Sequence, residues 1–125
     1  MKVRALLMLL VLGLAALSVA QGTAIRPEEI TAERVGQTVV VEGRVYSSNK
    51  TSAGIHLYFG ADTSTAFQAL VTSASFHKFK VDIEKQYSSR NVRVTGKLEQ
   101  DSGRFFVRIE EPSQIKVAPR KRGTS

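Results

Sequence analysis

The chain has 125 residues, which is enough for one domain, and it contains no cysteine. This composition excludes a disulfide-stabilised scaffold, a cysteine nucleophile and a thiolate-bound metal. The formal net charge is +7, from 18 basic and 11 acidic residues. Most of the excess lies at the two ends, because residues 21–115 carry 12 basic and 11 acidic residues. The body is therefore nearly neutral, and the basic C-terminal tail either binds an anionic partner or is simply a solvated end.

The first twenty residues have the pattern of a secretory signal peptide. Lys2 and Arg4 precede an apolar run from Ala5 to Leu17, and Ser18-Val19-Ala20 is a small-x-small cleavage site. An uncleaved membrane anchor is the alternative, but the apolar run falls short of the roughly 20 residues that a span needs. We expect cleavage after Ala20, no membrane span in the mature chain, and a periplasmic or secreted product.

Residues 21–36 are predicted to form a short helical lead-in, because Pro27 suits a first helical turn and Glu28 and Glu29 suit its positive end. Two later stretches then share one pattern, in which apolar residues alternate with polar ones around Gly43 and again around Gly96. Strict alternation predicts strands with one buried face. The matching glycines predict a sharp bend or a close approach between backbones.

Five strands follow from these patterns, with Val41 and Val94 in the core. Residues 47–54 and 60–65 are predicted to be polar loops with Asp62 as a turn residue, and residues 100–103 a tight hairpin turn. Pro112 should end the last strand, Ile115 should pack back on the core, and residues 118–125 should be disordered. The strands are expected at Thr38–Tyr46, Ile55–Gly60, Ala66–Thr72, Arg90–Glu99 and Arg104–Glu110.

Between the third and fourth strands the apolar period changes. Phe76, Phe79, Ile83 and Tyr87 recur at helical spacing, which predicts a helix over residues 73–87 that closes one end of the sheet. Ser73 or Ser75 is the expected cap.

The residues from Thr31 to Val117 resemble a bacterial OB-fold domain that is often attached to secreted nucleases and other extracytoplasmic DNA-handling proteins, and that is similar to the tRNA-anticodon-binding type. The resemblance depends on L-x-F-G at Leu57–Gly60, V-x-V-x-G-x-L at Val92–Leu98 and P-x-Q-I at Pro112–Ile115. It implies an all-β fold, namely a five-stranded Greek-key OB-fold barrel over residues 37–117 with a helix between strands three and four.

OB-folds generally bind ligands on the outer face of strands two and three and on the flanking loops. Tyr46 and Tyr58 are the candidate platforms for stacked bases, with basic side chains for the phosphates. The alternative is that both tyrosines only cover the barrel. A second basic group, Arg90, Arg93, Lys97 and Arg108 with Phe106, is either a further site or a solvated strand face. The candidate binding residues are Arg44, Tyr46, Lys50, His56, Tyr58, Gln68 and Arg104.

Catalysis has little support in this sequence. The two histidines, His56 and His77, fall on different expected elements, and no nucleophile, zinc or phosphate-loop motif is present. We expect no enzyme activity, no cofactor and no metal. The leading hypothesis is a secreted module that binds single-stranded nucleic acid weakly and without sequence preference. The alternatives are a periplasmic or envelope-stress protein that binds a small ligand, a glycan or another envelope protein, and an accessory domain of a secreted nuclease.

Overall fold

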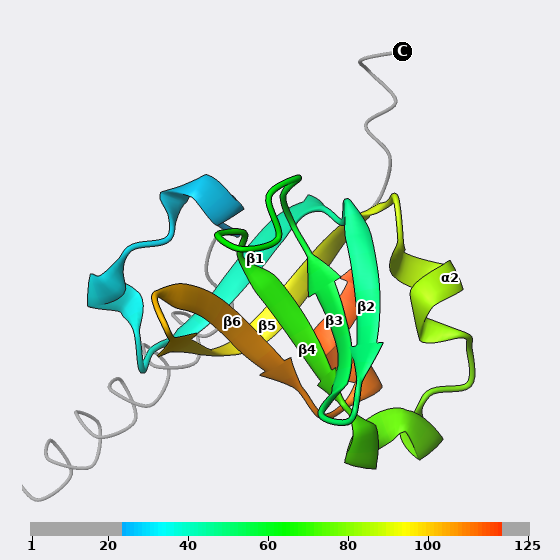
Figure 1. Cartoon of the computed structure of the whole chain (residues 1–125). Helices are drawn as coiled ribbons and strands as arrows, with labels where there is room; N and C mark the ends of the chain where they lie inside the picture. Colours follow the sequence, from blue (N-terminus) through cyan, green and yellow to red (C-terminus); the bar gives the residue numbers. More distant parts are fainter. Residues whose placement is uncertain (1–23, 119–125) are drawn as a thin grey trace, which may run out of the picture.

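The computed structural model describes residues 24–118 (Figure 1). The expected signal peptide, residues 1–20, and residues 119–125 of the basic tail lie outside the described residues. The 3-10 helices are η1 (Pro27–Glu29), η2 (Ala32–Arg34), η3 (Ser73–Lys78) and η4 (Pro112–Gln114), and the α-helix is α2 (Ile83–Tyr87). The strands are β1 (Thr38–Arg44), β2 (Ser47–Thr51), β3 (Gly54–Tyr58), β4 (Gln68–Thr72), β5 (Asn91–Asp101), β6 (Arg104–Ile109) and β7 (Ile115–Val117).

The described strands form one seven-stranded sheet in the order β1-β5-β6-β4-β3-β2. Strand β7 lies outside this order and pairs with residues 92–94, near the N-terminal end of β5. All pairs are antiparallel except β4 with β6, which is parallel. In Figure 1, β6, β4, β3 and β2 lie side by side in front, while β1 and β5 pass behind them. The two end strands of this order, β1 and β2, are consecutive in the chain, with only Val45 and Tyr46 between them. The part of the chain that the structure describes is thus mostly β with few helices, and its arrangement is that of an OB-like fold.

The core lies between the front strands and the pair behind them. Val41 and Val94, which face each other across β1 and β5, are fully buried, as the alternation predicted. Leu57 of β3 and Val107 of β6 are also fully buried. Each of these residues occupies the inward position of a strand whose neighbours in sequence are more exposed.

Of the two roles expected for the matching glycines, a sharp bend or a close approach between backbones, the approach is made by side chains. A Cβ at Gly96 would lie 2.6 Å from a methyl group of Val107. A Cβ at Gly43 would lie 2.9 Å from the ring of Pro27, so this glycine allows η1 to pack on β1. Within the predicted lead-in, residues 27–29 and 32–34 form two short 3-10 helices, and an unexpected bridge joins Ile25 to Val41.

Two stretches predicted to be irregular are strands. Residues 47–51, expected to lie in a polar loop, form β2, whose outer edge is exposed and whose other edge pairs with β3. This strand has no apolar alternation because it covers little core. Ile115 packs inward as expected, but residues 115–117 also pair with β5 as β7, and Ala118 is buried and bonded to Asn91. The expected disorder from residue 118 is therefore wrong at Ala118.

The helix predicted over residues 73–87 is also wrong in its length. The chain forms η3, then a non-helical bend over residues 79–82, then α2. Asp82 caps α2 by accepting a hydrogen bond from the amide of Lys85, which replaces the expected serine cap. The apolar face is correct, since Ile83 and Tyr87 are buried, and burial raises the pKa of the Tyr87 phenol above its ordinary value. Across residues 24–118, no helix is long and apolar enough to cross a bilayer.

Candidate functional site

The strand register places a row of side chains across the outer face of the front strands. Tyr58 of β3 lies opposite Gln68 of β4, Gln68 lies opposite Phe106 of β6, and Phe106 lies opposite Glu99 of β5. Neighbouring strands lie about 4.8 Å apart, so the Tyr58 and Phe106 backbones are separated by about 10 Å. In this row the side-chain amide of Gln68 therefore has one ring on each side, Tyr58 on β3 and Phe106 on β6.

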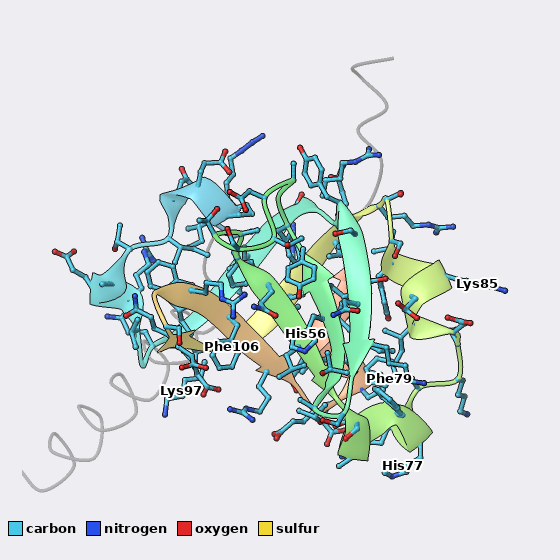
Figure 2. The ribbon with its side chains drawn as sticks, in the orientation of Figure 1. His56, His77, Phe79, Lys85, Lys97 and Phe106 are labelled. Atoms are coloured by element: carbon cyan, nitrogen blue, oxygen red, sulfur yellow. The ribbon has the colours of Figure 1, made fainter. Side chains whose placement is uncertain are left out.

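A second row runs beside the first one. His56 of β3 lies opposite Leu70 of β4, and Leu70 lies opposite Arg108 of β6. The rings of His56 and Tyr58 are nearly parallel, with an interplanar angle of 11° and centroids 6.1 Å apart. Figure 2 shows His56 and Phe106 on this face of the sheet. We call the two rows, from Tyr58, Gln68 and Phe106 to His56, Leu70 and Arg108, the ring face.

Both ring nitrogens of His56 are engaged. Nδ1 lies 2.6 Å from Oε1 of Gln68, and because that oxygen can only accept, Nδ1–H is the donor. Nε2 lies 3.0 Å from the hydroxyl of Thr51 on β2. Hydrogen bonds on both sides of the ring fix its orientation, so this imidazole is a rigid part of the surface.

Gln68 was expected to point outward as an exposed binding residue. It lies on the expected face, but it is only 6% exposed. Its Oε1 is held by His56, whereas its amide nitrogen has no hydrogen-bond partner within residues 24–118. The two N–H donors of this amide therefore remain available at the floor between the rings.

Phe106 and Arg108 were assigned to a separate basic group, but the structure places them on the ring face. The Arg108 guanidinium lies 5.7 Å from the centroid of the Phe106 ring and bonds both oxygens of Glu99, at 3.1 and 3.3 Å. Hydrogen bonding to Glu99 raises the pKa of Arg108 above its ordinary value. The sequence alone did not reveal this placement, because the parallel pairing of β4 with β6 brings together residues distant in the chain.

Arg104 lies on the same side of β6 as Phe106 and Arg108, at the hairpin end of the ring face. The hairpin turn is tight, as predicted, with positive φ at Ser102 (53°) and Gly103 (80°), as a type I′ turn requires. Arg104 is half-buried and forms no ion pair with any of residues 24–118. It is therefore an available cation at one end of the rings.

Three of the predicted residues lie elsewhere. Lys50 belongs to strand β2 rather than to a loop, and its ammonium lies 5.6 Å from the centroid of the Phe76 ring. Arg44 and Tyr46 line a groove of about 720 Å³ between β1 and the residues around η1. The amide of Tyr46 nevertheless bonds the carbonyl of Tyr58, so Tyr46 lies where this groove meets the ring face.

The rest of the second basic group does not gather with Phe106 and Arg108. Arg93 bonds Glu42 across β5 and β1, with its Nη2 2.7 Å from the carboxylate, while Arg90 and Lys97 are exposed. His77 is exposed on η3, as expected, and lies far from His56 in Figure 2. Within residues 24–118, no three His, Asp or Glu side chains come together as metal ligands would.

Solved structures share this fold. Asparaginyl-tRNA synthetase from Pyrococcus horikoshii matches with a TM-score of 0.53 and 21% identity, over 74% of this chain and 22% of the synthetase. Aspartyl-tRNA synthetase from Entamoeba histolytica matches with a TM-score of 0.55 and 16% identity, over 76% of this chain and 21% of the synthetase. This chain thus spans about a fifth of the length of these enzymes, and the likeness concerns the fold alone.

A small protein also shares the fold over most of its length. The OBody AM1L10, solved bound to hen egg-white lysozyme, matches with a TM-score of 0.56 and 21% identity, over 78% of this chain and 92% of its own. No protein-family model matches the chain. No curated protein matches it either.

Proposed function

We propose that this chain is a non-enzymatic module that binds single-stranded nucleic acid through the ring face. The observation that carries the proposal is the row of Tyr58, Gln68 and Phe106, in which two half-exposed rings flank an amide with free N–H donors. Every base has a flat π-face, so exposed rings bind bases with little sequence preference. Two of the solved structures that share this fold are tRNA synthetases, enzymes whose name gives a nucleic acid as substrate, and this supports the same class of ligand.

The shape of the ring face suits unpaired bases better than a duplex. We take the curled sheet as an OB-type barrel, in which the continuous chain from β1 to β2 closes the cylinder. The outer rows of such a barrel are narrow and carry rings, whereas duplex binding generally requires a helix or ribbon that enters a groove. Arg104 and Arg108 are the cations on β6 that would contact phosphates beside the stacked bases.

Binding is expected to be weak, because few cations accompany the rings. Arg108 is already paired with Glu99, and such an exposed pair contributes at most about 1 kcal/mol, so a phosphate can displace the carboxylate. We further propose that the chain acts after export to a periplasm or out of the cell, as its N-terminal pattern indicates.

The direct test is fluorescence anisotropy with labelled single-stranded DNA at two salt concentrations. We expect saturable binding at low salt that weakens as salt rises, with a slope of about −0.7 per phosphate contact on logarithmic axes. A duplex of the same sequence is the control and should bind more weakly. Absence of binding to single strands at low salt would reject the proposal.

Protein binding is the second candidate, because the OBody with this fold is bound to a protein, hen egg-white lysozyme. Glu99 and Asp101 of β5 border the ring face, opposite Phe106 and Arg104, so the charge around it does not exclude a protein partner. A chain that binds no oligonucleotide at low salt, yet forms a stable complex with an envelope protein through Tyr58, would favour this candidate.

A further inference from the structure

We propose that the bound strand does not end at the ring face but crosses Tyr46 and continues into the groove between β1 and η1, where Arg44 contacts its phosphates. This inference rests on the proposed function and adds a second part to the site. The groove has a volume of about 720 Å³, which is within the range of ligand pockets, and none of the six residues of the ring face lines it.

The charges in the groove favour an anionic occupant. Three guanidinium groups line it, from Arg26, Arg44 and Arg93, against the two carboxylates of Glu28 and Glu42. Arg93 Nη2 lies 2.7 Å from Oε1 of Glu42, so this carboxylate is neutralised by an ion pair. Arg26 Nε lies 3.8 Å from Oε2 of Glu28, which is a long ion pair between two exposed side chains. Arg44 forms no ion pair with any of residues 24–118, so its planar fork of donors is free for a phosphate.

Tyr46 connects the groove to the ring face. Its side chain is 55% exposed, although large apolar side chains on this domain are mostly covered. Its amide donates to the carbonyl of Tyr58, which fixes the two tyrosines as neighbours at the junction of β1 and β2. A ring that is exposed at a junction between two surfaces can stack a base of a strand that passes from one to the other.

The local backbone places Gly43 and Tyr46 in the lining of the groove. Val45 is fully buried, and Tyr46 and Ser47 both lie opposite Tyr58, so the in-out alternation changes where β1 leads into β2. Arg44 and Tyr46 are exposed on either side of the buried Val45, so the alternation of β1 carries Tyr46 outward. A Cβ at Gly43 would clash with the ring of Pro27, so the absence of a side chain at this position allows η1 to pack directly on β1 beside the groove.

The test compares short and long oligonucleotides on the full chain. Oligothymidylates of about 4 and about 16 nucleotides bracket the range of site sizes known for single OB-folds. We expect Arg44→Gln to weaken the affinity for the long oligonucleotide by about 3- to 10-fold. The slope of its log affinity against log salt concentration should fall by about 0.7, and the affinity for the short oligonucleotide should not change. Lys85→Gln removes the same charge from α2, none of whose residues line the groove, and should change neither.

The outcomes separate the two proposals. If both oligonucleotides bind but Arg44→Gln weakens them equally or not at all, the strand does not enter the groove, while the ring face retains its function. If Lys85→Gln has the same effect as Arg44→Gln, the contact is general electrostatic attraction and the inference is overturned. If neither oligonucleotide binds the wild-type chain, the proposed function itself fails. Arg44 is exposed, so its replacement should leave the melting temperature unchanged, which circular dichroism checks.

Discussion

Alanine at both Tyr58 and Phe106 is expected to weaken binding of single-stranded DNA by at least about 30-fold, because each stacked ring contributes about 1–3 kcal/mol. Each single replacement should account for part of this loss. The two rings stand on either side of Gln68 and would each contact a different base, so their separate losses should add approximately. Anisotropy with one labelled oligonucleotide at fixed salt measures all three variants.

Two controls separate stacking from folding. Phe106→Tyr keeps the ring and should retain the wild-type affinity within about twofold, since a phenol stacks as a phenyl does. Phe79→Ala removes a partly buried ring at the η3 end, as Figure 2 shows, and should lower stability without weakening DNA binding. Unchanged affinity in the double alanine variant would mean that the ring face is not the binding surface.

Gly54→Ala is expected to destabilise the fold by about 3 kcal/mol or more, beyond the usual cost of a strained backbone. Gly54 begins β3 with a φ of +150°, and a Cβ there would overlap the carbonyl oxygen of Val71 on β4. That oxygen belongs to the backbone of the β3–β4 pair, so it cannot move away as a flexible side chain could. For a domain of this size, such a loss lowers the melting temperature by more than about 12 °C.

Gly103→Ala is the matched control. Gly103 also has a positive φ, +80°, but a Cβ there would meet nothing within 4 Å. Only the left-handed strain remains, which costs about 1–2 kcal/mol. Equal losses in the two variants, measured by thermal or urea unfolding, would contradict the close approach between the backbones of Gly54 and Val71.

The sequence was sufficient to predict the core but not every edge of the sheet. Alternation around Val41 and Val94 predicted two buried strand faces because a strand with one side in the core repeats every second residue. The same criterion failed for β2, since an edge strand with exposed residues has no apolar period. It also failed for β7, whose three residues are too few for a period to be seen.

The break between η3 and α2 had a local signal. Asp82 is a strong capping residue, and it precedes Ile83 by one position, so it could have indicated a new helix start. The four apolar side chains at helical spacing outweighed it, because they pack on the core whether the helix is continuous or interrupted.

The candidate site was predicted in part, and the difference comes from pairing. Tyr58, His56 and Gln68 alternate along two sequential strands, so the sequence placed them on one face. Phe106 and Arg108 reach that face only through the parallel β4–β6 pair, which no local pattern reveals. Lys50 was assigned to the site because its segment was interpreted as a loop, and Arg44 and Tyr46 leave the face where the alternation changes at β2.

The most direct test of the ring face is a map of backbone amide chemical shifts in the ¹⁵N-labelled chain during titration with single-stranded DNA. The largest changes should fall on β3, β4 and β6, around Tyr58, Gln68 and Phe106, with smaller changes at Arg104. Changes confined to α2 or to the basic residues after Ala118, with none at Tyr58 or Phe106, would contradict the account.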